Sequence, residues 1–199
     1  MTSQTLSGVD FFEMTMTSGA FDHYDGTFAG GQEANNKVDA DILYKDPETR
    51  AKIVNGLAEL AVEFKPDLIV PIPHGADKWG EALAHELGDI PVSRLKKIES
   101  APGFKNTDFK NELSQGRVNR SKRLLLVEDF CNRWTSTRGG LFIPSVRRKA
   151  VGLVGIGYRG TPDNRVAAPI KSKFLWEHRI PDILEDNDPL WEYADTAGQ

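Results

Sequence analysis

The sequence predicts an α/β domain in which helices cover both faces of a parallel β-sheet. Short apolar runs that are typical of buried strands occur at 68–72, 123–127 and 150–158. Segments with the spacing of one buried helical face, 47–64 and 76–87, alternate with runs of this kind. Strands that alternate with helices of this length form βαβ units, which place the strands parallel to one another.

The length of 199 residues suits one domain. We expect a single domain over 1–199, with an N-terminal hood at 1–45, a core at 46–160 and a C-terminal extension at 161–199. The first 36 residues, rich in Gly, Thr, Ser and Asp, favour short strands or an irregular cap over a helix.

Composition excludes several classes of protein. The net charge of -4 and the lack of a basic aromatic stripe argue against nucleic-acid binding. The sequence has no apolar run near the roughly 20 residues that span a membrane, and no signal-peptide pattern at its start. Cys131 is the single cysteine, so an intrachain disulfide is impossible. We therefore predict a cytoplasmic protein without a membrane partner.

The first elements of the core are marked by capping residues. Asp46-Pro47 is typical of a helix start, and the helix is expected to stop at 65–67. A strand at 68–72 and a helix over 76–87, ended by Gly88, should follow.

The second half of the core has less regular spacing. A further strand is possible at 91–95, whereas 96–120 is polar and predicts a mobile functional loop. The strand 123–127 should end directly at Glu128-Asp129, and 150–158 should form the next strand. The tail should pack back as a strand near 174–176 and a short terminal element near 190–191.

Three polar segments follow predicted strands, at 71–78, 128–137 and 158–160. Ligands of open parallel sheets bind beyond the carboxyl ends of the strands, so we expect these segments to converge. Two adjacent carboxylates there could accept charge-assisted hydrogen bonds from two sugar hydroxyls. They would also stabilise positive charge that develops on the sugar carbon as a leaving group departs.

The run LLLVEDFCNRWTST resembles the PRPP-binding motif of type I phosphoribosyltransferases, with four apolar residues, two acidic residues and a Thr-rich phosphate loop. The order of the surrounding segments is similar to that of orotate phosphoribosyltransferases over roughly residues 19–160. The resemblance implies the type I phosphoribosyltransferase fold, with a Rossmann-like core, a small hood and a mobile loop.

The resemblance also implies an enzyme that moves the 5-phosphoribosyl group of PRPP to a nitrogen of a pyrimidine-like or other small base and releases pyrophosphate. Magnesium would be the cofactor, held mainly by PRPP with a possible contact to Asp129. A homodimer is implied as well. The implied catalytic groups are Glu128, Asp129 and two lysines of the mobile loop, Lys97 and Lys105, although lysines in such a segment can equally be a solvated surface.

Binding roles follow from the same resemblance. The implied sets are Asn132, Arg133, Thr135, Ser136 and Thr137 for the phosphate of PRPP; His74, Gly75, Ala76, Asp77 and Lys78 for pyrophosphate; and Asn132 with Arg159 for the base.

The phosphate loop departs from the family pattern, because Trp134 stands where glycine is usual. Pro144 also interrupts the helix that should follow. One alternative is therefore a protein of the same fold that binds PRPP or a nucleotide without transferring the ribosyl group. Another is the reverse reaction, pyrophosphorolysis of a nucleotide.

Overall fold

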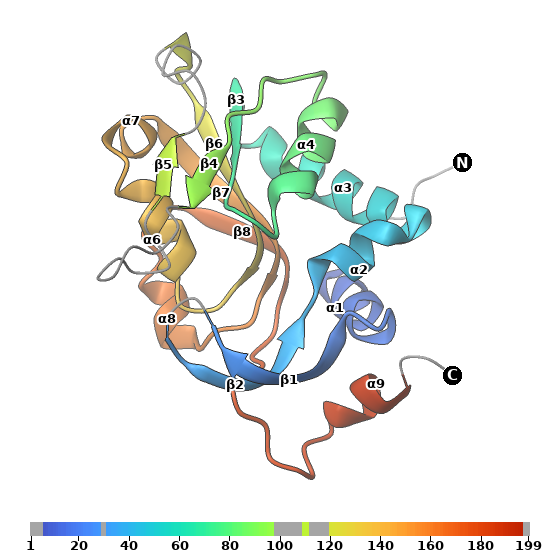
Figure 1. Ribbon diagram of the computed structural model, residues 1–199. Coiled ribbons are helices and arrows are strands. Elements are labelled where there is room, and N and C mark those ends of the chain that lie inside the picture. Colours follow the sequence, from blue (N-terminus) through green and yellow to red (C-terminus); the bar gives the residue numbers. More distant parts are fainter. Residues whose placement is uncertain (1–5, 29–30, 98–108, 112–119, 197–199) are drawn as a thin grey trace.

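The computed structural model describes residues 6–28, 31–97, 109–111 and 120–196, without the side chains of 97 and 109–111. Its centre is a four-stranded parallel sheet in the order β3-β6-β7-β8 (Figure 1). The strands are β3 (Leu68–Pro71), β6 (Leu124–Cys131), β7 (Ala150–Tyr158) and β8 (Ser172–Glu177). Val92 adds one parallel bridge to Ile69 beyond β3. The predicted parallel sheet is confirmed.

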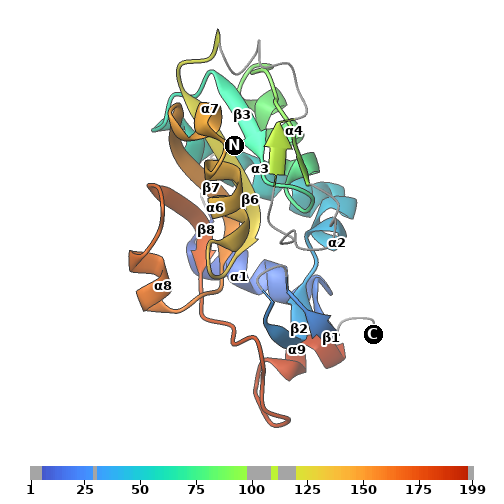
Figure 2. The same ribbon diagram turned by 60° about the vertical axis from the view of Figure 1, so that its left-hand side comes forward.

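Helices lie on both faces of this sheet, as predicted (Figures 1 and 2). One face packs against α1 (Gly8–Thr17), α3 (Pro47–Val62) and α4 (Asp77–Glu86), and the other against α6 (Thr135–Leu141) and α7 (Pro144–Arg147). Both faces of the sheet are therefore covered, which explains the nearly continuous apolar runs of β3, β7 and the first half of β6.

A smaller layer lies beyond the carboxyl ends of the strands. It consists of an antiparallel pair, β1 (Phe21–Thr27) and β2 (Glu33–Val38), with α9 (Trp191–Thr196) packed on β1 (Figure 1). The helix α2 (Ala40–Lys45) leads from this hood into α3. The helix α8 (Pro162–Val166) connects β7 to β8. The strand β8 lies in the predicted C-terminal extension and is an edge strand of the central sheet.

Local signals explain several element boundaries. Asp46 caps α3 by accepting a hydrogen bond from the Thr49 N–H at 2.7 Å. Gly88 follows α4 with φ of +88°, a conformation in which glycine carries no Cβ penalty. Pro144 starts α7 at its first turn instead of breaking one long helix.

The expectation that no helix forms in the first 36 residues was wrong, because α1 lies there. Ser7 and Asp10 form a reciprocal capping box, and Phe11 and Met16 are buried against the sheet. The hydroxyl of Thr15 accepts a hydrogen bond from the Trp176 indole N–H at 3.1 Å. The two Thr and one Val within this helix lower its intrinsic propensity, and tertiary packing overrides that preference.

The segment 96–120 also contains structure that was not predicted. The strands β4 (Leu95–Lys97) and β5 (Phe109–Asn111) pair antiparallel. The remainder of the predicted mobile loop, including Lys105, lies outside the described residues.

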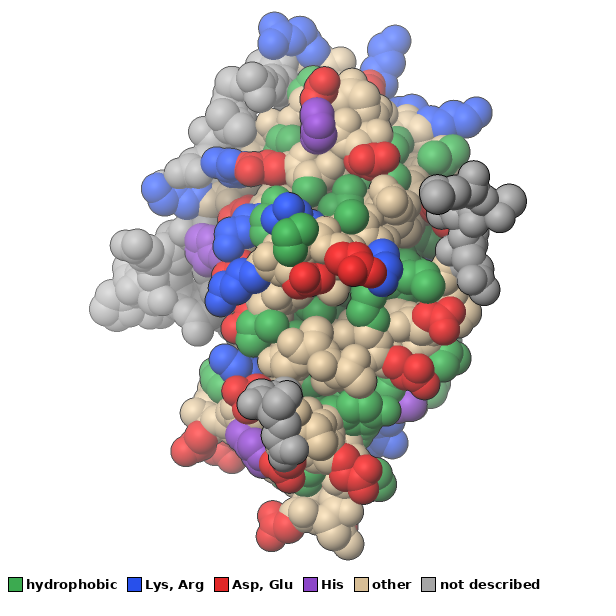
Figure 3. Space-filling model, turned by 90° about the vertical axis from the view of Figure 1, so that its right-hand side faces the viewer, with side chains coloured by type: hydrophobic (Ala, Val, Ile, Leu, Met, Phe, Trp, Pro, Cys, Tyr) green, Lys and Arg blue, Asp and Glu red, His purple; other side chains and the backbone are tan. Residues whose placement is uncertain are grey.

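Figure 3 shows the face that carries α1 to α4. Basic, acidic and hydrophobic side chains are interspersed over this face, and no continuous basic surface is visible on it. In the described part of the chain, no helix has the length and apolar character needed to cross a membrane.

Candidate active site

The acidic pair lies within β6 and not after it. Phe130 and Cys131 still pair with Gly157 and Tyr158 of β7, so the expectation that the strand ends at Glu128 was wrong. The strand was expected to end with its apolar run, and the acidic residues Glu128 and Asp129 inside the strand interrupt that run. Because successive strand residues face opposite sides, Glu128 and Asp129 have different neighbours.

Glu128 is buried and faces α6. Its carboxylate accepts a hydrogen bond from the Thr137 hydroxyl at 2.9 Å. Burial, with the charge of Asp129 as a second cause, raises the pKa of Glu128 well above the ordinary value. Glu128 is therefore a buried carboxyl group that ionises less readily than usual unless a hydrogen-bond donor or a cation binds beside it.

Asp129 is half-buried and faces the loop after β3. A Cβ atom on Gly75 would overlap the Asp129 carboxylate, so this approach requires glycine. Burial raises the pKa of Asp129, against the lowering effect of the Phe130 N–H. Asp129 thus joins β6 to the loop that was predicted to bind pyrophosphate.

That loop lines a hollow of about 420 Å³ beside the acidic pair. His74 is exposed, with Nδ1 3.7 Å from Asp77 Oδ2, and the Pro73–His74 peptide bond is cis. The Lys78 ammonium lies 2.8 Å from Asp41 Oδ1 of α2, which raises the pKa of Lys78. Ala76 is fully buried, its N–H donates to the Ile72 carbonyl and its carbonyl accepts from the Gly80 N–H, so it does not line the hollow.

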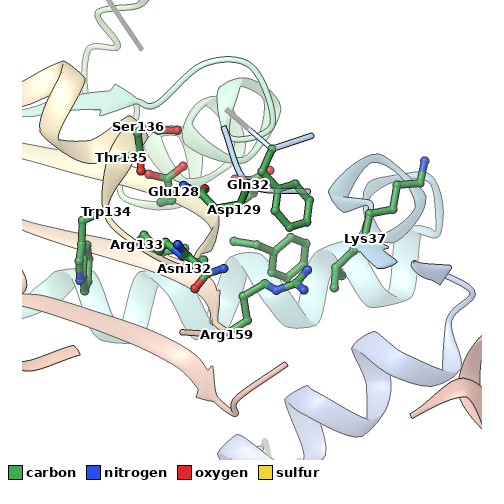
Figure 4. Close-up of a pocket in the computed structure, with 14 residues that line it drawn as sticks. Gln32, Lys37, Glu128, Asp129, Asn132, Arg133, Trp134, Thr135, Ser136 and Arg159 are labelled. Atoms are coloured by element: carbon green, nitrogen blue, oxygen red, sulfur yellow. The ribbon is translucent and has the colours of Figure 1, made fainter. Parts of the chain in front are cut away.

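The main cavity lies on the other side of the pair and measures about 220 Å³. It is bounded by the end of β6, by the phosphate loop (residues 132–137) and by the hood, as Figure 4 shows. Helix α6 begins in this loop at Thr135, so its first N–H groups have no partner inside the helix. Such N–H groups, with the hydroxyls of Thr135 and Ser136, form a ready anion site.

Trp134 does not fill this cavity. Its backbone takes the left-handed conformation (φ +63°), and its indole is buried and stacked on Tyr158 at 5.3 Å between ring centroids. The indole N–H donates to the Asn164 carbonyl at 2.6 Å. Figure 4 shows the ring directed away from Glu128 and Asp129. The unusual tryptophan is therefore an anchor beneath the loop.

Arg159 enters the cavity from the end of β7. It is 4% exposed, and its pKa is lowered to about 10 by burial. One terminal nitrogen donates to Asn36 Oδ1 at 2.6 Å, and the guanidinium lies 5.2 Å from the centre of the Phe28 ring. Among the described residues, no group accepts a hydrogen bond from its Nε atom, which is buried. A buried donor of this kind is suited to an acceptor on a ligand.

Comparisons with known proteins agree on the architecture. Orotate phosphoribosyltransferase from Aeropyrum pernix superposes with a TM-score of 0.63 at 14% identity, covering 83% of this chain and 92% of that one. Adenine phosphoribosyltransferase from Leishmania tarentolae gives 0.61 at 16% identity, covering 84% and 87%. A phosphoribosyltransferase from Corynebacterium diphtheriae gives 0.62 at 17% identity, covering 85% and 95%.

Sequence comparison finds similarity to phosphoribosyltransferases as well. Adenine phosphoribosyltransferases from two Prochlorococcus marinus strains, MIT 9303 and MIT 9313, are 27% identical over 155 residues, which is 69% of this chain and 87% of each relative. No protein-family profile matches the chain. The chain has the fold of the type I phosphoribosyltransferases and resembles the adenine enzymes among them in sequence.

In this chain the predicted residues fall into two neighbouring groups. The main cavity brings together Glu128, Asp129, Asn132, Arg133, Thr135, Ser136 and Arg159, with Thr137 directly behind Glu128. The hollow beside it contains His74, Asp77 and Lys78, with Gly75 between the two groups. Lys97 belongs to β4 but its side chain is not described, and Lys105 lies outside the described residues.

Two groups of residues in this site were not predicted from the sequence. The hood contributes Phe28, Gln32, Lys37 and Val38 to the cavity wall. Asp182 accepts hydrogen bonds from Asn132 at 2.5 Å and from Arg133 at 2.7 Å. No motif marks these positions, because a contact between a hood or a tail and a distant loop has no fixed spacing in the sequence.

Proposed function

We propose that this protein transfers the 5-phosphoribosyl group of PRPP to a ring nitrogen of a small base and releases pyrophosphate. The observation that carries the proposal is the position of Glu128 and Asp129 between an anion cradle and the His74 loop. In this arrangement the cradle would bind the phosphate of PRPP, the carboxylates would bind the ribose hydroxyls, and the His74 loop would receive pyrophosphate.

The carboxylates would act on the bond that breaks. As the C–O bond to pyrophosphate lengthens, the ribose carbon becomes positive, and the base nitrogen donates its electron pair to that carbon. Carboxylates fixed by Thr137 and Gly75 would stabilise this charge without reorganising. The hood would cover the reacting atoms and exclude water.

Magnesium fits the site as an ion that PRPP carries. No cluster of three or more His, Cys, Asp or Glu side chains in the described residues could hold a metal without it. Asp129 is the carboxylate placed to share such an ion, because it lies between the cavity and the His74 loop. Bound to the phosphate oxygens, magnesium would neutralise the leaving pyrophosphate.

For the base we propose a ring that carries carbonyl or carboxylate acceptors, such as a carboxylated pyrimidine. The N–H groups of the Arg159 guanidinium can only donate, and the buried Nε has no acceptor among the described residues. Lys37 lines the cavity but directs its ammonium away from it, with Asp39 Oδ2 at 3.8 Å. Adenine would present its exocyclic amino donor to these donors, so we expect it to be the poorer substrate. The relatives named above that act on adenine therefore do not decide the base.

The test is pyrophosphate release from PRPP with magnesium in the presence of orotate, uracil, hypoxanthine or adenine. We expect the highest kcat/KM with orotate or a related carboxylated ring. Preference for adenine would overturn the base assignment and leave the transfer reaction standing. Lack of turnover with every base, together with no affinity for PRPP, would overturn the transfer reaction itself.

A binding protein without transfer activity is not favoured, since the indole that suggested it stacks on Tyr158 and is directed away from the acidic pair. A homodimer in the cytoplasm remains a prediction, and sedimentation velocity tests the oligomeric state.

A further inference from the structure

The five residues at 180–184, here called the strap, run between the hood and the phosphate loop. Two asparagines of β2 bind the strap from the hood. The Asn35 side-chain amide donates from Nδ2 to the Leu184 carbonyl at 2.7 Å, and its Oδ1 accepts from the Leu184 N–H at 2.9 Å. The Asn36 amide donates to the carbonyls of Pro181 and Asp182, at 2.9 and 3.2 Å. The strap is therefore fixed to the hood through its backbone.

The opposite side of the strap binds the phosphate loop through one side chain. The Asp182 carboxylate is only 11% exposed, and each of its oxygens has a donor from the loop. Oδ1 accepts from the Asn132 amide at 2.5 Å, and Oδ2 accepts from the Arg133 guanidinium at 2.7 Å. A single carboxylate thus binds two consecutive residues at the start of the loop.

A phosphate loop must hold its N–H groups in one conformation, and glycine-rich loops do so with backbone geometry that only glycine adopts easily. In this chain the corresponding residues are Asn132, Arg133 and Trp134. Trp134 takes a left-handed conformation without being glycine, and its indole is fixed to Asn164 from below. Asp182 fixes the two residues before it. Side-chain contacts on both sides of the loop therefore fix the conformation that glycine residues would otherwise allow.

We propose that Asp182 is a positioning residue that holds the phosphate loop in its phosphate-binding conformation. The inference rests on the proposed function, and it places Asp182 behind the loop and out of contact with substrate. Arg133 pairs with Asp182 and also lines the cavity, so this ion pair sets the position of the guanidinium charge beside the cavity. The affinity for PRPP should therefore depend on Asp182, while the affinity for the base should depend on it much less.

The experiment compares Asp182→Asn and Asp182→Ala with the wild type. Asparagine keeps one acceptor but turns an amide donor toward Asn132 or Arg133, so it is the milder change. Asp186→Asn, an exposed position that follows the strap, is the matched control. Calorimetry gives the dissociation constant of PRPP, steady-state kinetics give KM for each substrate and kcat, and hydrogen exchange follows the amides of residues 132–137.

For Asp182→Ala we expect the KM and the dissociation constant of PRPP to rise about tenfold or more, since charge-assisted hydrogen bonds to the loop are lost. The KM of the base should change by less than about threefold, and loop amides should exchange faster while those of α3 do not. Combined with Arg133→Ala, the effects on PRPP affinity should be less than additive.

The inference is overturned if both Asp182 variants bind PRPP as the wild type does and their loop amides exchange at the wild-type rate. It is also overturned if Asp186→Asn has the same effects, since these would then reflect charge alone. Failure of the proposed function looks different, because the wild type itself would not bind PRPP. Hydrogen exchange of the loop would still decide the role of Asp182 in that case.

Discussion

Glu128 and Asp129 are neighbours in the chain, yet β6 turns them to different partners. One accepts from Thr137 at the start of α6, and the other lies against the backbone of Gly75. Burial raises the pKa of both, so each is less stable as a charge in the free protein than in water. Ribose hydroxyls or a cation bound beside the two carboxylates would stabilise their charged forms, which burial in the free protein disfavours.

Replacing Asp129 by Asn should separate this chemical role from stability. We expect kcat to fall about 100-fold or more, because a neutral amide does not stabilise the developing positive charge. The free energy of unfolding at pH 7 to 8 should stay equal or rise slightly, since a raised pKa means that the charged form opposes folding. Urea unfolding and steady-state kinetics measure the two effects, and full activity in this variant would contradict the assigned role.

The pH dependence of activity should reflect the same pair. The two carboxyl groups stabilise a developing positive charge only when they are ionised, so kcat/KM for PRPP should fall as pH decreases through their raised pKa values. The midpoint should lie above the value of about 4 of an ordinary carboxyl group. PRPP phosphates also titrate near pH 6, so the profile of Asp129→Asn is the necessary comparison. An unchanged profile in that variant would assign the midpoint to Glu128 or to the substrate and not to Asp129.

The pH dependence of stability checks independently that the pKa of Asp129 is raised in the folded protein. The difference in unfolding free energy between Asp129→Asn and wild type should be fully present above the folded-state pKa of Asp129. It should shrink as pH falls through that value and vanish below the ordinary pKa of an aspartate. A difference that grows toward acid pH would show that the pKa is lowered instead.

At the scale of elements, the phosphate loop connects β6 to α6 with side chains where glycines are usual. Trp134 contributes a buried indole stacked on Tyr158, with Phe174 also in ring contact, so the loop and the hydrophobic core on this face of the sheet form one unit. Loop geometry here depends on core packing.

Replacing Trp134 by Gly tests this dependence. Glycine should relieve about 1 kcal/mol of backbone strain at the left-handed position. The lost indole should cost roughly 3–5 kcal/mol, so a net loss of about 2–4 kcal/mol in unfolding free energy is expected. Trp134→Phe should lose less. Chemical denaturation measures both variants, and a glycine variant as stable as the wild type would show that the indole contributes little.

Elements with local signals were predictable from the sequence. The Asp46 cap, the apolar run of β7 and Pro144 at the start of α7 each set a boundary through contacts within a few residues. The helix α1 was not predictable in the same way, since its stability comes from packing on β8, far along the chain. The continuation of β6 through Glu128 also depends on pairing with β7.

At the scale of the whole molecule, the site is assembled from the core, the hood and the tail. The acidic pair and the phosphate loop follow from one run of sequence, whereas Phe28, Asn36 and Asp182 reach the site only through the tertiary fold. Arg159 shows the connection most directly. It leaves the core sheet, donates to Asn36 of the hood and also donates to the Pro181 carbonyl of the strap.

Because three parts of the chain form the cavity, a ligand that binds there should stabilise the molecule as a whole. PRPP with magnesium at 100 times its dissociation constant should add about 2.7 kcal/mol to the free energy of unfolding. For a chain of 199 residues this corresponds to a rise in Tm of roughly 5–10 °C. Differential scanning calorimetry measures the shift, with ribose 5-phosphate and pyrophosphate as partial ligands.

Each partial ligand should produce a smaller rise than PRPP, since each would occupy one side of the acidic pair. A rise with pyrophosphate alone that equals the rise with PRPP would contradict a site that also holds the ribose phosphate. Asp129→Asn should retain part of the PRPP shift, because the phosphate loop and Arg133 are unchanged in that variant. If the shift is instead unaffected by magnesium, the ion is not part of the bound complex.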